Sequence, residues 1–115
     1  MVVWDIKSVE MGDNHMYGSI FRMKVKPGQD AKLLDSFRKW ETERKPKVKG
    51  AVASLLLKSD EHPGEYVGVA VFKDKASYTA NANDPEQDKW FRQMRSLLQS
   101  DVEWQDGEYV FGTIV

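Results

Sequence analysis

The chain has 115 residues, and its 17 lysines and arginines against 18 acidic residues leave a formal charge of −1. This length fits one domain with one core, and so balanced a charge gives no field to hold nucleic acid or a membrane surface, so we expect neither partner. The absence of cysteine excludes disulfides and thiolate chemistry. The sequence also contains no run of about 18 apolar residues, which is the length needed to span a bilayer. We expect a cytoplasmic protein.

The first segment, residues 1–16, precedes the recognisable domain, which we assign to residues 17–115. Apolar residues alternate along the chain at Val2 and Trp4, and a turn-forming run follows at Gly12-Asp13-Asn14. We expect an N-terminal arm or an extra strand here, followed by a loop.

A half-buried strand is predicted from Tyr17 to Lys26, where apolar and charged residues alternate until Pro27-Gly28 ends the pattern. An amphipathic helix follows to about Arg44 and stops at Pro46, because proline disfavours a helical conformation at the residue before it. The apolar stripe of this helix consists of Leu33, Leu34, Phe37 and Trp40.

Two β-rich runs come next, from Ala51 to Leu57 and from Tyr66 to Phe72. Turn-forming residues lie between them, among them His62-Pro63-Gly64, so we predict a β-hairpin. Both runs carry apolar residues on both sides, which indicates that neither face of this hairpin is left to water.

The second helical region is predicted to consist of two pieces. Asp74 is suited to cap a helix from Lys75 to Ala80, after which Asn81 and Asn83 interrupt the pattern. Pro85 suits the first turn of the next helix, because its fixed backbone angle is already helical. The apolar stripe of that helix consists of Trp90, Phe91, Met94, Leu97 and Leu98. This stripe must pack on the sheet, and Gln87 belongs to the opposite, polar face.

The last predicted strand runs from Tyr109 to Val115, with both faces buried. With it the order is βαββαβ, which predicts a ferredoxin-like α+β fold: a four-stranded antiparallel sheet with its helices on one face. The remaining face is too apolar for water. We therefore predict a homodimer in which the sheets of two chains cover each other.

Several of these stretches resemble the antibiotic biosynthesis monooxygenase domain of the dimeric α+β barrel superfamily, over Tyr17 to Val115. The stretches that carry the resemblance are the run from Phe21 to Gly28, the helix ending in Trp40, the hairpin around His62-Pro63-Gly64, and Phe72 to Tyr78 before a broken helix. The resemblance implies a dimer whose sheets close into a shared barrel, with a pocket between each sheet and its helices.

The resemblance also implies an activity. Some members of this family oxidise phenolic or quinol-like molecules with O₂ and without metal or flavin, so we expect a monooxygenase that acts on a small planar aromatic molecule and uses no cofactor. The alternative is a non-catalytic ligand-binding or structural homodimer of the same fold, because one fold serves several functions.

Haem degradation, a third activity in the family, is not expected. The haem-degrading members use an asparagine on the first strand together with a tryptophan and a histidine on the second helical region. Here Tyr17 to Lys26 has no asparagine, and neither His15 nor His62 lies between Asp74 and Ser100. Each histidine is placed as a solvated loop residue would be, and neither has a companion at metal-ligand spacing, so we expect no metal site.

Five aromatic residues are candidates to line the pocket and stack on a planar substrate, with plain core packing as the competing interpretation. They are Trp40, Tyr66, Phe72, Trp90 and Phe91. Asn81 and Asn83 could hydrogen-bond a phenol or enolate oxygen, although capping and turn formation is the favoured explanation, because asparagine is abundant at helix breaks. Arg22 could stabilise an oxyanion if its side of the strand faces the pocket, and is a solvated charge otherwise.

Overall fold

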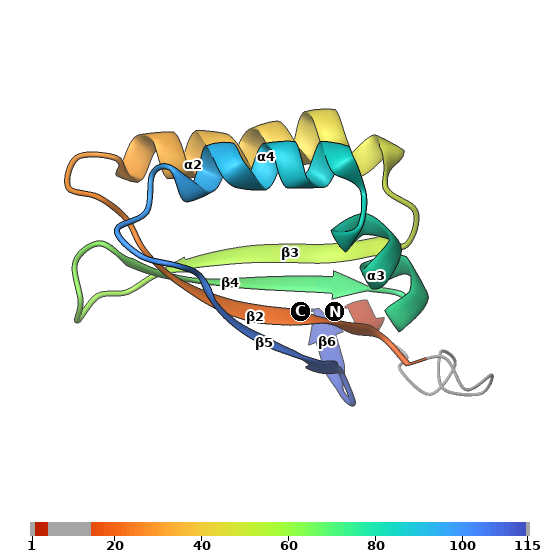
Figure 1. The fold of residues 1–115 in the computed structure, drawn as a ribbon. Coiled ribbons are helices and arrows are strands. Elements are labelled where there is room, and N and C mark those ends of the chain that lie inside the picture. Colours follow the sequence, from red (N-terminus) through yellow and green to blue (C-terminus); the bar gives the residue numbers. More distant parts are fainter. Residues whose placement is uncertain (1, 5–14, 115) are drawn as a thin grey trace.

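The computed structural model describes residues 2–4 and 15–114, and it is a two-layer α+β structure (Figure 1). The strands are β1 (Val2–Trp4), β2 (Tyr17–Lys24), β3 (Ala51–Lys58), β4 (Glu65–Phe72), β5 (Glu103–Glu108) and β6 (Gly112–Ile114). The helices are α2 (Asp30–Lys39), α3 (Lys75–Ala82) and α4 (Pro85–Arg95), with a π-helical turn η1 (Trp40–Arg44) and a 3₁₀ turn η2 (Lys45–Lys47) after α2. The predicted α+β order is confirmed.

The main sheet is antiparallel and has the strand order β3-β4-β2-β5. The predicted hairpin is the β3–β4 pair, and the first predicted strand is β2, which lies between β4 and β5. Helices α2 and α4 lie side by side over one face of this sheet, and α3 lies at one end (Figure 1). The helices are therefore on one face, as the element order predicts.

The fourth strand of the sheet is Glu103–Glu108, so the prediction that Tyr109 to Val115 closes the sheet is wrong. β5 is an edge strand whose six residues are all exposed, and it therefore lacks the apolar alternation that marks a strand in the sequence. Val110 and Phe111 are also exposed rather than buried. β6 pairs with β1 in a separate two-stranded sheet, and the loop predicted at Gly12-Asp13-Asn14 lies outside the described residues.

The two short helices begin where the sequence predicts. The Asp74 carboxylate accepts a hydrogen bond from the backbone N–H of Ser77 at 2.7 Å, and the Asp84 carboxylate accepts one from the backbone N–H of Glu86 at 2.9 Å. Each aspartate satisfies a backbone donor that the first helical turn leaves free. α3 extends two residues beyond the predicted Ala80, and the break falls at Asn83.

The main core lies between the sheet and the helices at the end where α2 begins and α4 ends. Its buried members are Phe21, Met23, Val25, Leu33, Tyr66, Met94, Leu98 and Val102. Backbone hydrogen bonds close this end: the N–H of Val25 donates to Gly64, and that of Lys26 donates to Leu97, each at 2.8 Å. These hydrogen bonds join segments that are far apart in the sequence. We call this end of the molecule, where α2 begins and α4 ends, the closed end.

Within the described residues, no helix lies over the other face of the main sheet (Figure 1). Leu55 and Leu57 of β3 are 68% and 61% exposed on this face, and Ile20 of β2 is exposed on it as well, across β4 from Leu55. Arg22 also points to this face, because it alternates with the buried Phe21 on β2. Among the described residues, no helix is both long enough and apolar enough to cross a membrane.

Candidate functional site

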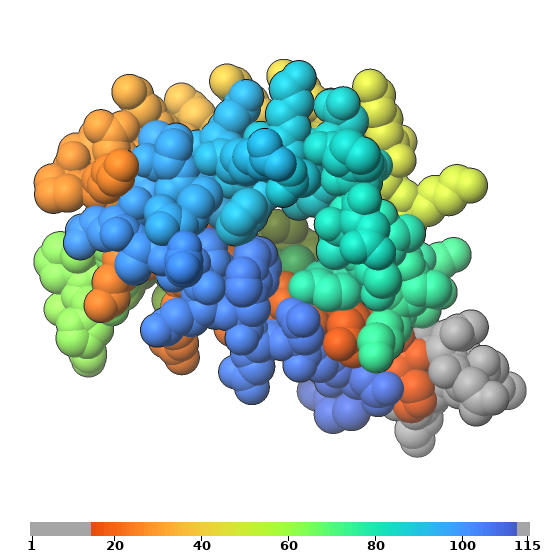
Figure 2. Space-filling view, in the orientation of Figure 1, coloured from red at the N-terminus to blue at the C-terminus, as the bar shows by residue number. Residues whose placement is uncertain are grey.

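A cavity of about 420 Å³ lies between the sheet and the helices at the end of the molecule that carries α3. Figure 2 shows the surface hollowed there, between α4, α3 and β5. The aromatic residues that line it are Phe21, Phe37, Trp40, Phe72, Tyr78, Trp90, Phe91 and Trp104. A concave site of this size with aromatic walls is the kind that binds small organic molecules.

A row of small side chains across the sheet makes room for the cavity. Ser54 of β3, Ala70 of β4 and Ser19 of β2 are register partners on neighbouring strands, and all three line the cavity. Phe21 and Gly68 are register partners two positions further along β2 and β4. The phenyl ring of Phe21 lies over Gly68, and a Cβ atom on this glycine would come within 2.1 Å of the ring. Gly68 thus makes room for the Phe21 ring beside this row, and the small residues of the row leave the cavity open.

The two tryptophans predicted to line the pocket do so, and each indole N–H has a partner. Trp40 Nε1 donates to Gln87 Oε1, and Trp90 Nε1 donates to the carbonyl oxygen of Ser36, both at 2.8 Å. Trp90 also packs edge-on against Phe37, with the ring centroids 5.4 Å apart. Because the N–H groups are already bonded, the indoles contribute apolar ring surface to the cavity.

The remaining aromatic candidates divide between the cavity and the core. Phe72 and Phe91 line the cavity; Phe72 packs edge-on against Tyr78, and Phe91 lies 5.8 Å from Trp104 between ring centroids. Tyr66 does not line it, contrary to expectation. Its hydroxyl donates to Asp30 at 2.6 Å, and this hydrogen bond, together with burial, raises the pKa of the Tyr66 phenol to about 12. Tyr66 belongs to the closed end.

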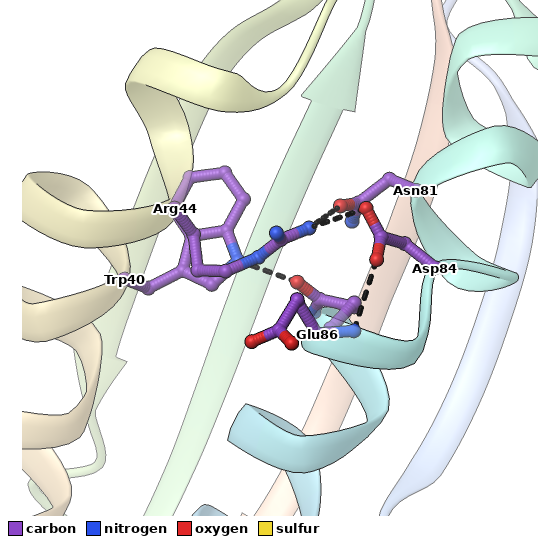
Figure 3. Close-up of polar contacts among 6 residues, drawn as sticks. Trp40, Arg44, Asn81, Asp84 and Glu86 are labelled. Carbon is purple, nitrogen blue, oxygen red and sulfur yellow. Dashed lines mark hydrogen bonds and ion pairs between the residues drawn. The ribbon is translucent and has the colours of Figure 1, made fainter.

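Asn81 lines the cavity but is engaged in a tie between the helices (Figure 3). Arg44, buried at the end of the π-helical turn, donates from Nη2 to Asn81 Oδ1 at 2.9 Å and lies 3.4 Å from Asp84 Oδ2. Trp40 and Gln87 form a second link across the same gap. These contacts hold the turn after α2 against the α3–α4 junction and so fix one wall of the cavity.

Two other polar candidates lie away from the cavity. Asn83 is exposed and ends α3, with its backbone N–H donating to the carbonyl of Thr79, so its place in a helix break explains it. Arg22 is exposed on the helix-free face of the sheet, opposite Phe21. Of the two interpretations of Arg22, the structure favours the solvated charge.

Three polar side chains from three different elements meet at the floor of the cavity. Ser19 of β2 and Asp106 of β5 are register partners, and the hydroxyl of Tyr78 in α3 donates to Asp106 Oδ1 at 2.9 Å. Burial raises the pKa of the Tyr78 phenol to about 12; nearby Ser19 acts in the opposite direction, and Asp106 adds to the rise. The phenol therefore stays protonated and remains a donor to the carboxylate.

Some of these lining residues left a signal in the sequence. Ser19 is two residues before Phe21, which places both on the same face of a strand. Gln87 was assigned to the polar face of α4, yet it precedes Trp90 and Phe91 by three and four residues, the spacing of one helix face. Asp106 left no such signal, because the strand that carries it was not predicted.

Within residues 2–4 and 15–114, no three histidine, aspartate or glutamate side chains lie close enough together to form a ligand set. His62 is exposed in the β3–β4 turn, where its backbone N–H donates to Ser59 Oγ. His15 Nδ1 lies 3.9 Å from Glu108 Oε2.

Solved structures with the same fold include proteins from three bacteria. A variant of SnoaB, a cofactor-independent oxygenase from Streptomyces nogalater, is 17% identical with a TM-score of 0.73, and the match covers 86% of this chain and 96% of that chain. A candidate antibiotic biosynthesis monooxygenase from Caulobacter crescentus CB15 is 15% identical with a TM-score of 0.75, covering 84% and 92%. The NE2512 protein of unknown function from Nitrosomonas europaea is 22% identical with a TM-score of 0.70, covering 89% and 95%.

These identities are low, so the structures show the shared fold and no more. No curated protein matches the chain by sequence. A family model described as antibiotic biosynthesis monooxygenase, however, matches residues 16–93, which is more than half of the chain. This range includes β2, the hairpin and α3, the elements whose turns and caps carried the resemblance in the sequence, and that resemblance is confirmed. The chain belongs to the antibiotic biosynthesis monooxygenase family.

Proposed function

We propose that this protein is a cofactor-independent monooxygenase that oxidises a planar phenolic or quinol-like molecule in the cavity above the row of small residues. The observation that carries the proposal is the cavity of about 420 Å³, with aromatic walls above a polar floor. Family membership and the shared fold with SnoaB, described as a cofactor-independent oxygenase, support it.

The chemistry asks little of the protein. One atom of O₂ enters the substrate and the other leaves as water, and the substrate itself supplies the electrons. The protein must hold the ring, exclude water and offer groups that tolerate the substrate's hydroxyl proton and the resulting anion. We assign ring stacking to the walls around Trp40, Phe72, Trp90 and Phe91, because flat aromatic surfaces hold planar rings at little entropic cost.

Oxygen consumption tests the proposal directly. Purified protein at high concentration is mixed with 1,4-dihydroxynaphthalene and a panel of related dihydroxyarenes, with a chelator present, and uptake above autoxidation is recorded. The substitution Ala70→Phe, which fills the cavity floor, provides the matched control: it should abolish the enzymatic uptake while the far-UV circular dichroism is unchanged. No uptake above background with any member of the panel counts against the oxygenase.

A homodimer is the second part of the proposal. Leu55, Leu57 and Ile20 expose apolar surface on the helix-free face of the sheet, and burying about 800 Å² per partner there is enough for a stable interface. Sedimentation equilibrium at micromolar protein should give twice the chain mass. Leu55→Asp with Leu57→Asp should give monomers, whereas Leu34→Asp on the outer side of α2 should not. A monomeric parent protein would exclude this arrangement.

The alternative is a non-catalytic binding protein, which the structure also allows because satisfied indoles and apolar walls can hold a ligand without reacting groups. Titration calorimetry under nitrogen separates the two. Binding of a dihydroxyarene without oxygen uptake in air favours the binding protein, and binding with uptake favours the oxygenase.

A further inference from the structure

The most unusual polar atom of the cavity is the hydroxyl of Ser19. Ser19 is 2% exposed and lines the cavity, and within the described part of the chain its Oγ makes no hydrogen bond of good geometry, although it lies close enough to the Tyr78 hydroxyl to lower the pKa of that phenol. Leaving a buried hydroxyl unsatisfied costs about 1–3 kcal/mol, and buried polar groups are as a rule bonded. A group that can accept a hydrogen bond from Ser19 therefore belongs in the cavity.

The carboxylate of Asp106, which lies next to Ser19, favours a group that donates a hydrogen bond. Asp106 lies directly across from Ser19 on β5, and its Oδ1 already accepts from the Tyr78 hydroxyl at 2.9 Å. Asp106 itself is exposed on the edge strand, so its carboxylate can accept further hydrogen bonds from solvent or from a ligand in the cavity. An ionised carboxylate can accept several hydrogen bonds and cannot donate any. A group that accepts from Ser19 and also donates to Asp106 therefore suits both residues.

A hydroxyl oxygen does both at one atom, and on a ligand it can replace a water that would otherwise bridge the two side chains. We propose that Ser19 and Asp106 bind the hydroxyl of an aromatic ligand, which donates to Asp106 Oδ2 and accepts from the Ser19 hydroxyl. Tyr78 acts as a positioning residue, because its hydrogen bond fixes which carboxylate oxygen is free. This deepens the proposed function and, for turnover, rests on it; the binding step itself stands without it.

The arrangement makes the site selective against close analogues. A methyl ether keeps the acceptor but has no proton to donate, so it places an apolar methyl group against the Asp106 carboxylate and displaces solvent from it. A site built to hydrogen-bond a hydroxyl rejects analogues that lack the donor more strongly than a purely apolar pocket can. Both ligands stack equally well on the aromatic walls, so a difference in their affinities measures the hydrogen bonds to Ser19 and Asp106.

The experiment compares 1-naphthol with 1-methoxynaphthalene as probes, by quenching of tryptophan fluorescence under nitrogen. The parent protein should bind 1-naphthol at least tenfold more tightly. Ser19→Ala and Asp106→Asn should each reduce this ratio to about one to three, mainly by weakening 1-naphthol, and Tyr78→Phe should lower it to an intermediate value. The ratio is insensitive to partial loss of folded protein, which would weaken both probes equally.

The matched control is Glu108→Gln, which removes a carboxylate from the same strand and the same side as Asp106 but outside the cavity, and it should leave the ratio unchanged. The proposal is overturned if the parent protein does not distinguish the probes, if it binds neither, or if Ser19→Ala and Asp106→Asn leave the ratio as it was. If the parent protein prefers 1-naphthol but shows no oxygen uptake, the proposed oxygenase activity is contradicted and the proposed hydroxyl-binding site is supported.

Discussion

The helix-covered face of the sheet is packed solid at one end and hollow at the other, although the same strands and the same pair of helices cover both. At the closed end the strands contribute large side chains such as Met23 and Tyr66. At the hollow end they contribute Ser54, Ala70 and Ser19 in one cross-strand row. A shift of four residues along β2 and β4 thus decides between core and cavity. The reason is that the volume of the side chains in one cross-strand row determines whether the space between the sheet and the helices is filled.

The two ends also differ in how they treat polar atoms. The closed end buries Tyr66 but gives its hydroxyl a partner in Asp30. The hollow end buries the Ser19 hydroxyl and the Arg44 Nε without a hydrogen bond among the described residues. Satisfied groups stabilise a fold, whereas unsatisfied groups beside a cavity mark where a ligand or water completes the structure. Substitutions at the two ends should therefore have different kinds of effect.

The largest effect on stability is expected at the closed end. Leu33 is 0% exposed, and Leu33→Ala should lower the free energy of unfolding by about 2–5 kcal/mol because it leaves a cavity in close-packed core. Its neighbour Leu34, 42% exposed, is the matched control, and Leu34→Ala should cost about 1 kcal/mol or less. Urea unfolding measures both. Equal costs would show that this end is not the packed part of the molecule.

The next effect concerns the tie that holds the hollow end together. Arg44, whose side chain is 11% exposed, links the π-helical turn to Asn81 and Asp84. Arg44→Ala should lower the free energy of unfolding by about 1–3 kcal/mol, because it removes the charged hydrogen bond to Asn81, the ion pair with Asp84 and the packing of a buried side chain. Arg38→Ala, which removes an exposed ion pair with Asp35, should change it by about 0.5 kcal/mol or less. Indistinguishable effects in urea unfolding would mean that the tie does not stabilise the wall.

A smaller effect is expected from Tyr66→Phe, which should cost about 1–1.5 kcal/mol near pH 8 by removing the hydrogen bond to Asp30. The pKa of this phenol is raised from 10.0 to about 12, so its stabilising contribution is present below pH 10 and is lost as the pH rises toward 12. The difference in unfolding free energy between parent and variant should shrink over that interval.

The same variant also tests where Tyr66 belongs. Because its side chain lies outside the cavity, Tyr66→Phe should leave the affinity for 1-naphthol unchanged. A tenfold loss of affinity would place Tyr66 at the ligand, as the sequence had indicated, and would break the division between the two ends.

The smallest effect is expected at the cap of α3. Asp74→Ala should cost about 0.5–1 kcal/mol at neutral pH, since it removes the acceptor for Ser77 N–H. The hydrogen bonds from Ser77 hold the pKa of the Asp74 carboxyl below its usual 3.8. The cap's contribution is therefore present above pH 3.8 and is lost as the pH falls through the lowered value. Parent and variant should unfold alike at about pH 2; a constant difference would point to another cause.

Comparison of sequence and structure shows which features could be predicted. The turn at Pro27-Gly28, the cap at Asp74 and the helix start at Pro85 were found, because each depends on residues within a few positions of one another. The strand β5 was missed, since an exposed edge strand needs no apolar alternation. The cavity residue Asp106 was lost with it.

Other differences arose from side chains whose neighbours are distant in the chain. Tyr66 and Phe72 lie on the same face of one strand, yet one contacts Asp30 in the core and the other lines the cavity. Nothing within β4 distinguishes them. Whether each side chain lies in the core or lines the cavity depends on which part of α2, α3 or α4 lies above it. That is determined by packing between elements that are distant in the chain.

The sequence by itself determined the family, the order of the elements and the faces of β2 and α4, because periodicity, turns and caps are local properties of the chain. Only the tertiary structure decided that Ser54, Ala70, Ser19 and Asp106 form one row and that Tyr78 reaches it from α3. Strand register is a long-range property, and a cavity is the space that several such registers leave between them.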